Sequence, residues 1–207
     1  MNIVLQKDEK RFIGVLLGED KTNSSVILSE TKNLKNGFTD RSFASAQDDK
    51  SDRQNDERID VILAGENSEI EIVGLLLAKG ESQTAFEVYL THTGKNTKSK
   101  VNVRAVLRGK SKFDFRGNVK IENGAKGADA YLRSDALLFD DAKMGDDTPA
   151  LEILERDVKA GHAATIGKVD ELMLFYLMSR GITKIQAEKL LIAGFTQPIL
   201  DKIKHVQ

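Results

Sequence analysis

The feature that most constrains this fold is a succession of short strand-like runs between Ile59 and Leu154. The runs alternate apolar with polar residues, as in VNVRAVL at 101–107, and Gly, Asn, Asp or Lys-Gly turn signals separate them. They are IDVILAG, SEIEIVGLLLAKG, TAFEVYLTH, SKVNVRAVLRG, SKFDFRGNVKIENG, ADAYLRSDALLFDD and PALEILERD. Because successive side chains of a strand point to opposite faces, each run buries one face. The pattern is typical of a sandwich, a barrel or a β-solenoid and leaves the three open, since no strict repeat motif is evident.

Downstream of these runs the apolar period changes from two to about 3.6, which indicates helices. A first helix is expected over 169–180, where Gly181 can adopt the left-handed conformation that ends a helix. A second is expected over 184–193 with Thr183 as its N-cap, and a third over 196–205. The sequence thus predicts a strand-rich body that carries a helical tail.

Composition limits the partners that this chain can attract. With 31 basic and 32 acidic side chains the net charge is −1, so there is no global field for a nucleic acid or an anionic membrane, and we expect neither as a partner. No apolar run approaches the roughly 20 residues that cross a bilayer, and the N-terminal sequence lacks the apolar core of a secretory signal. We therefore expect a cytoplasmic protein.

The chain contains no cysteine. This excludes disulfides, a thiolate nucleophile, and any zinc or iron-sulfur site that is ligated only by the chain's own sulfurs.

The segment 22–57 differs from its surroundings because it is rich in Asn, Ser, Asp, Lys and Gln and its few apolar residues follow no sustained period. The stretches on either side of it, 1–20 and 57–65, look like adjacent strands of one sheet. We interpret the segment as a disordered or loop insertion at the surface.

Five sequence blocks follow one another in the second half of the chain. They are Pro149 to Ile153, Asp157 to Lys159, His162 to Gly167, Phe175 to Ile182 and Leu190 to Phe195. In this order they resemble the C-terminal signature of the SufB/SufD family of iron-sulfur cluster assembly proteins, and the resemblance is closer to SufD. A looser likeness extends upstream, for example through His92 with Ser99 seven residues on, so that the resemblance covers roughly residues 60 to 200.

The resemblance implies a fold and a function. The fold would be a right-handed parallel β-helix over residues 1–165, followed by a small C-terminal α-helical domain over 166–207. The chain would be a non-enzymatic scaffold subunit of the SUF iron-sulfur cluster assembly complex. It would pair through the β-helix with a SufB-like subunit or with itself, dock a SufC-like ATPase, and bind no ATP of its own.

The helical tail carries the residues that this family resemblance assigns to partner binding, which are Phe175, Tyr176, Ser179, Arg180 and Gly181. We expect this stripe, together with Leu172, to be mostly core that packs the tail onto the end of the β-helix. Its polar members are expected at the ATPase interface, because Arg and Tyr concentrate binding energy when they are desolvated.

His162 is the candidate metal ligand, because neutral imidazole is a good ligand for iron. We place it at the passage from the last strand to the helical tail, where it either ligates or merely orders a turn. The resemblance matches it to the histidine implicated in cluster formation by SufD. The family commonly has cysteine where this chain has Ala160, and glycine where it has Ala163. One imidazole cannot hold a cluster, so any cluster would be transient and shared with thiolates of a partner subunit.

Other polar groups are interpreted as structural. His92 is expected to be a strand-end structural histidine, and Glu152 and Asp157 to be solvated, because a strand and its exit place them on opposite sides of the sheet. The glycines of 124–127 lack the spacing of a phosphate-binding loop.

Two other functions stay open. One is a degenerate family member that is retained as a structural partner without a cluster role. The other is a β-helical carbohydrate-active enzyme, which needs clustered carboxylates and an aromatic platform, whereas aromatic residues make up only 6% of this chain.

Overall fold

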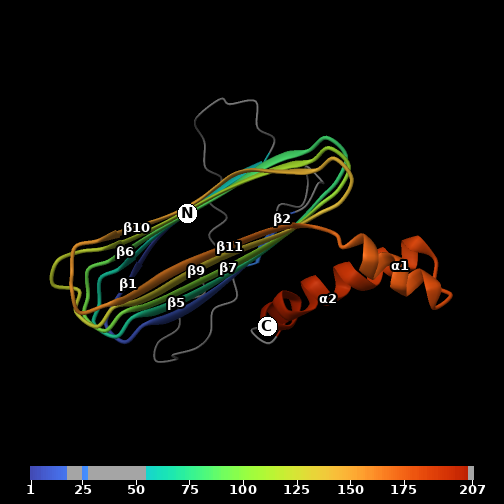
Figure 1. Cartoon of the computed structure of the whole chain (residues 1–207). Coiled ribbons are helices and arrows are strands. Elements are labelled where there is room, and N and C mark those ends of the chain that lie inside the picture. Colours follow the sequence, from blue (N-terminus) through green and yellow to red (C-terminus); the bar gives the residue numbers. More distant parts are fainter. Residues whose placement is uncertain (18–24, 28–54, 205–207) are drawn as a thin grey trace.

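The computed structural model describes residues 1–17, 25–27 and 55–204, and in it short strands stack as the coils of a parallel β-helix (Figure 1). The elements in chain order are β1 (Asn2–Leu5), β2 (Lys10–Leu17), β3 (Ser25–Ile27), β4 (Asn55–Leu63), β5 (Glu69–Ala78), β6 (Gln83–His92), β7 (Lys98–Leu107), β8 (Lys112–Ile121), β9 (Asp129–Leu138), β10 (Lys143–Ile153), β11 (Lys159–Lys168), α1 (Glu171–Ser179) and α2 (Lys184–Lys204).

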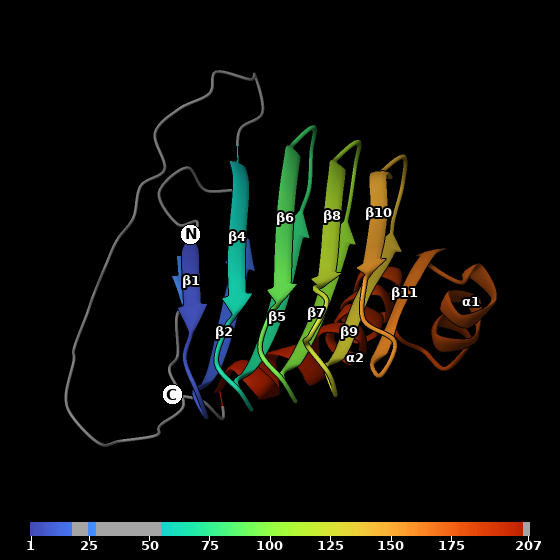
Figure 2. The same ribbon diagram turned by 90° about the vertical axis from the view of Figure 1, so that its left-hand side faces the viewer.

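Two sheets form the walls of the solenoid. One has the strand order β1-β4-β6-β8-β10 and the other the order β11-β9-β7-β5-β2-β3 (Figure 2). We call them sheet A and sheet B. Every described pair is parallel except β2 with β3. The prediction of a parallel β-helix is confirmed, and the seven strand-like runs correspond to β4 through β10.

The sequences on either side of the predicted insertion do neighbour each other, since β1 pairs with β4 along its whole length. The insertion itself, 22–57, lies outside the described residues apart from β3 and the first residues of β4. Strand β11 was missed, because KAGHAATIGK carries mostly small side chains and lacks the large apolar residues that indicate a buried strand.

A repeat that the sequence analysis missed lies in the turns. Asn67 and Asn96 occupy equivalent turns, and each has a positive φ, of 58° and 55°. The N–H of Asn67 donates to the carbonyl of Lys95, and that of Asn96 donates to the carbonyl of Lys126, so each turn is hydrogen-bonded to the next coil. The sequence signal is the pair of quartets GENS and GKNT, 29 residues apart, which repeat a Gly-x-Asn-Ser/Thr turn.

Close stacking of these turns requires glycine two residues before the asparagine. A Cβ atom at Gly94 would lie 2.6 Å from the carbonyl oxygen of Gly65 in the preceding coil, which is too close for any side chain. The turn sequence therefore fixes the coil-to-coil distance as well as the direction of the chain.

The core is the interior between the two sheets. Its largest fully buried side chains include Phe86, Phe113 and Phe115, and the ring centroids of Phe86 and Phe115 lie 6.0 Å apart. Because the strands are in register, side chains at equivalent positions stack on one another along the rod. Each coil thus covers the apolar face of its neighbour.

His92 is part of this core and is fully buried. Its Nδ1 lies 2.8 Å from the hydroxyl of Thr97, which itself donates to a backbone carbonyl, and its Nε2 lies 2.8 Å from the hydroxyl of Ser99. These partners fit a neutral ring in which Nδ1–H donates to Thr97 and Nε2 accepts from Ser99. Burial lowers the pKa of His92 to about 4. The interpretation of this residue as structural is confirmed.

Helix α2 lies along the outer face of sheet B (Figure 1). Ile199 and Ile203 of the helix form a buried cluster with Phe12, Val73 and Leu75 of the sheet. Three polar contacts fix the helix on this face, namely the ion pairs of Arg108 with Glu188 and of Lys202 with Glu71, and the hydrogen bond that Arg104 donates to the carbonyl of Phe195.

The predicted third helix is wrong, because α2 continues through Pro198 as one helix. The hydroxyl of Thr196 donates to the carbonyl of Ile192 at 2.9 Å instead of starting a new helix, and Thr196 is buried. Packing on sheet B therefore outweighs the loss of one backbone hydrogen bond at proline. The predicted N-cap Thr183 is confirmed, since its hydroxyl accepts from the N–H of Gln186.

The predicted end of α1 at Gly181 is also confirmed, because this glycine has a φ of +89°. Among the described residues, neither helix combines the length and apolar character that crossing a membrane would need.

His92 makes stability depend on pH. Its pKa is about 6.5 in the unfolded chain and about 4 in the fold, so the unfolded state binds more protons between these values. The free energy of unfolding should therefore fall by up to about 3 kcal/mol as pH drops from 6.5 to 4. Chemical denaturation of the wild type and of His92→Gln should show a shallower pH dependence of the free energy of unfolding in the variant. Equal slopes for wild type and His92→Gln would refute this assignment.

Docking of α2 should contribute to global stability. Ile199 is 1% exposed and Ile185, on the same helix, is 66% exposed. We expect Ile199→Ala to lower the free energy of unfolding by about 2–4 kcal/mol, because it leaves a cavity against sheet B. Ile185→Ala is the matched control and should change it by no more than about 0.5 kcal/mol. Urea titration followed by circular dichroism measures both, and equal effects would mean that α2 does not pack as described.

Candidate functional site

The last coil leaves one end of the β-helix uncovered. Strands β10 and β11 are the final strands of sheets A and B, and no described strand pairs with their outer edges (Figure 2). Met144, Leu151 and Ala160 pack against the core from this coil but stay partly exposed. Ile153 and Ile166, whose register partners are core residues, are exposed. We call the region formed by β10 and β11 the open end.

The two edge strands of the open end differ in how readily another strand can pair with them. The register of β10 with β8 shifts between Met144 and Asp147, and Pro149 has no N–H to donate. Bulges and prolines are devices that protect sheet edges from unwanted pairing. By contrast, β11 pairs with β9 without a shift from Lys159 to Lys168 and contains no proline. It presents a continuous edge to a further strand.

His162 lies in the middle of β11, not in a turn before the helices as the sequence suggested. It pairs with Leu132 of β9, whose side chain is fully buried in the core. Because register partners point to the same face, the imidazole belongs to the inward-facing row of the open end, where it is exposed. Ala160 belongs to the same row, two residues earlier. The interpretation of His162 as a residue that orders a turn is therefore wrong.

Asp147 is an inward-facing group of the open end that the sequence analysis missed. Both of its carboxylate oxygens lie 3.0 Å from the hydroxyl of Ser134, which donates to them from β9. Burial raises the pKa of Asp147, and the negative charges of Asp135 and Asp146 raise it further, while the hydrogen bond from Ser134 opposes the shift. The sequence GDD at 145–147 is typical of a turn, and only the register shift in β10 points the carboxylate of Asp147 inward.

The apolar stripe of α1 is exposed, so the expectation that it is mostly core is wrong. Leu172 is 79% and Phe175 is 71% exposed, and only Leu174 of this helix is buried. The reason is that, among the described elements, α1 packs mainly against α2, and α2 packs along the side of sheet B rather than over the open end. Both views place α1 at the periphery, and Figure 2 shows it beyond the last coil (Figures 1 and 2).

The polar residues of this helix end are coupled to each other. The guanidinium of Arg180 donates to the hydroxyl of Tyr176 at 3.2 Å and lies 5.1 Å from the centroid of its ring. The hydroxyl of Ser179 donates to the carbonyl of Tyr176 at 2.7 Å. Phe175 and Tyr176 are both exposed near the end of α1, and Gly181 directly follows its C-cap Arg180.

The other polar groups singled out in the sequence have structural surroundings. Glu152 is exposed and lies 3.5 Å from Lys120, and Asp157 is exposed in the turn that follows β10. Gly124 belongs to a turn, where its N–H donates to the carboxylate of Glu155. Within residues 1–17, 25–27 and 55–204, no group of three or more His, Asp or Glu side chains is placed to hold a metal ion.

Fold and site together define a class of protein, an end-open β-helix with an unpaired strand edge at its last coil and an exposed apolar helix beside it. Residues 42–195 match the family described as SUF system FeS cluster assembly, SufBD core domain. The chain belongs to this SufBD core domain family.

Curated relatives agree with this family. The chain is 39% identical over 129 residues to the iron-sulfur cluster assembly protein SufD of Bacillus subtilis, which covers 62% of this chain and 30% of that protein. It is 35% identical over 143 residues to an iron-sulfur cluster assembly SufBD family protein of Mycobacterium tuberculosis, covering 69% of this chain and 17% of that protein. It is 32% identical over 142 residues to an iron-sulfur cluster assembly SufBD family protein of Galdieria sulphuraria, covering 69% of this chain and 64% of that protein. The chain thus spans only part of the length of each.

Proposed function

We propose that this chain is a non-enzymatic scaffold subunit of a SUF iron-sulfur cluster assembly complex, with a role closer to that of SufD than of SufB. The observation that carries the proposal is the open end, where the edge strand β11 has neither a bulge nor a proline and carries the inward-facing His162. Membership of the SufBD family supports it. Pairing of β11 with a strand of a SufB-like or identical subunit would satisfy the free edge and cover Ile153 and Ile166.

His162 would serve as one ligand at the junction between the subunits. Its row faces the interior that a docked subunit would close, so the imidazole would meet groups of both chains. Since this chain has no cysteine, thiolate ligands would come from the partner, and the cluster would be transient cargo of the pair. An imidazole supplements thiolates as an iron ligand.

The exposed face of α1 is proposed as the docking surface for a SufC-like ATPase. Its residues Leu172 and Phe175 offer apolar area, and the Arg180–Tyr176 pair offers polar contacts at its end. Apolar groups of this size are unfavourable in water unless a partner covers them. Nucleotide would be bound by the ATPase and not by this chain.

Replacing His162 tests the ligand role. Because the side chain is exposed, His162→Ala should fold with an unchanged melting temperature. With a SufB-like partner and a SufC-like ATPase, anaerobic reconstitution with iron and sulfide should then yield several-fold less cluster absorbance than wild type. Thr165→Ala, an exposed residue of the same strand, is the control and should behave as wild type. Unchanged cluster yield in His162→Ala would favour a degenerate structural partner.

Replacing Phe175 tests the ATPase surface. Phe175→Asp should weaken binding of a SufC-like ATPase by about 30-fold, the effect of losing a central interface residue. Val4→Asp is the control, because Val4 is also exposed but lies on β1 at the opposite end of sheet A. Calorimetry with the purified ATPase measures both affinities. Equal affinities for wild type and Phe175→Asp would remove α1 from the interface.

A further inference from the structure

One inward row of sheet A changes its chemistry at the last coil. The residues in equivalent register on β6, β8 and β10 are Phe86, Phe115 and Asp147. The two phenylalanines are fully buried in the core. A carboxylate that continues such a row loses part of its hydration, so an apolar side chain would suit the row better. Packing alone therefore does not explain an acid at this position.

A bulge in β10 directs this acid inward. The register shift lies between Met144 and Asp147, where Gly145 and Asp146 stand opposite the single residue Asp114 of β8. The carboxylate of Asp114, which is 9% exposed, accepts the N–H of Asp146 at 2.7 Å. A Cβ atom at Gly145 would lie 2.0 Å from the same carboxylate oxygen, so glycine is needed while Asp114 holds the bulge. Residues of both strands thus build this irregularity.

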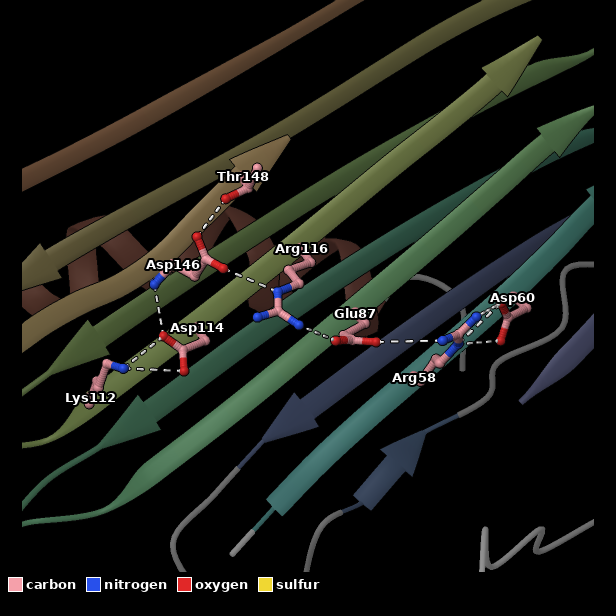
Figure 3. Close-up of polar contacts among 8 residues, drawn as sticks. All are labelled: Arg58, Asp60, Glu87, Lys112, Asp114, Arg116, Asp146 and Thr148. Carbon is pink, nitrogen blue, oxygen red and sulfur yellow. Dashed lines mark hydrogen bonds and ion pairs between the residues drawn. The ribbon is translucent and has the colours of Figure 1, made fainter. Parts of the chain in front are cut away.

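The neighbouring Asp146 is held on the outer face of sheet A (Figure 3). It ends a row of alternating charges that runs from Arg58 through Glu87 and Arg116. Successive members of this row lie 3.8, 3.2 and 3.2 Å apart. Because consecutive residues of a strand point to opposite faces, the ion pair of Asp146 with Arg116 keeps Asp147 on the inner face.

Asp147 and His162 project from opposite sheets into the same uncovered interior. His162 has Leu132 of β9 as its register partner, and the carboxylate of Asp147 accepts from the hydroxyl of Ser134, two residues further along β9. Two residues span about 6.6 Å of a strand, so the imidazole and the carboxylate belong to adjacent inward rows. On β11 the register partner of Ser134 is Ala164, whose side chain is a single methyl group. This strand therefore leaves space between the two groups.

The two donors have a chemical preference among metal ions. Imidazole is a good ligand for iron, and non-haem Fe(II) sites combine histidine with carboxylate. Soft ions such as Cu(I) prefer sulfur, whereas Mg²⁺ and Ca²⁺ prefer oxygen ligands alone. A site that offers one nitrogen and one carboxylate therefore suits Fe²⁺, the ion from which an iron-sulfur cluster is built.

We propose that Asp147 is a second metal-binding side chain of the open end, and that its carboxylate and the imidazole of His162 together hold one ferrous ion as cargo. The inference rests on the proposed function, in which His162 ligates iron, and it adds a ligand of a different chemical class. Ser134 orients the carboxylate, and Asp114 is a positioning residue that acts through the bulge. Water, or thiolates of a partner subunit, would complete the coordination.

Anaerobic equilibrium dialysis of the full chain against Fe²⁺ alone, without sulfide, tests the pair. The wild type should bind one Fe²⁺ per chain. Loss of even an outer-shell contact costs about 10–100-fold in metal affinity, so Asp147→Asn and His162→Ala should each raise the dissociation constant about tenfold or more. Glu152→Gln is the matched control and should bind as wild type does, because Glu152 is an exposed carboxylate of the same strand that lies near Lys120.

Two further measurements separate ligation from structure. Asp147→Asn should keep the wild-type melting temperature, because it conserves the size of the side chain and removes a charge that burial disfavours. Asp114→Ala, which leaves both ligands in place, should weaken Fe²⁺ binding several-fold by releasing the bulge. Asp114→Asn should retain the affinity, since its amide oxygen can still accept the N–H of Asp146.

Other outcomes overturn this inference and are distinguishable from failure of the proposed function. If the wild type binds no Fe²⁺, or if Asp147→Asn binds it as tightly as wild type, Asp147 is only an inward charge that protects the edge of β10. If His162→Ala then still lowers the cluster yield in the presence of the partners, the proposed function stands. If that yield is also unchanged, both fail.

Discussion

The structure depends on stacking the coils in register, and the turns enforce this register. Asn67 and Asn96 adopt left-handed conformations that few residues tolerate, and each donates its N–H to the following coil. Together with the close approach at Gly94, these contacts leave one spacing and one register for each coil. Inward rows of apolar side chains and outward rows of charges then follow, because every coil repeats the same alternation.

In a stack of repeated coils, the last coil has no following coil to cover its apolar face or to pair with its strand edges. The last coil keeps an inward face with Met144 and Leu151 only partly covered and two strand edges without a described neighbour. Helix α2 could in principle close such an end, but Ile199 and Ile203 bind it to the side of sheet B. Because α2 packs on the side of sheet B, it covers neither the open end nor the apolar face of α1.

Both surfaces support the proposed role as a component of an assembly complex. The chain has no cysteine that could join His162 as a ligand, and the outward charges of sheet A neutralise one another along the row from Arg58 to Asp146. The proposed scaffold role would use a stack of paired strands, an edge strand without a described partner and an exposed apolar helix that a partner could cover.

The sequence by itself determined the coil strands β4 to β10, the structural role of His92, the first helix with its stop at Gly181, and, through five ordered blocks, the family. These features are local, because the alternation of apolar and polar residues, the helix caps and the motifs each depend on residues that are close together in the sequence. Tertiary structure decided that β11 is a strand, since its small side chains gain order only by pairing with β9. It also decided that α2 is one helix on sheet B, that the stripe of α1 stays exposed, and that His162 and Asp147 face the same open end. The physical reason is that register and packing join residues far apart in the chain, which no local pattern encodes.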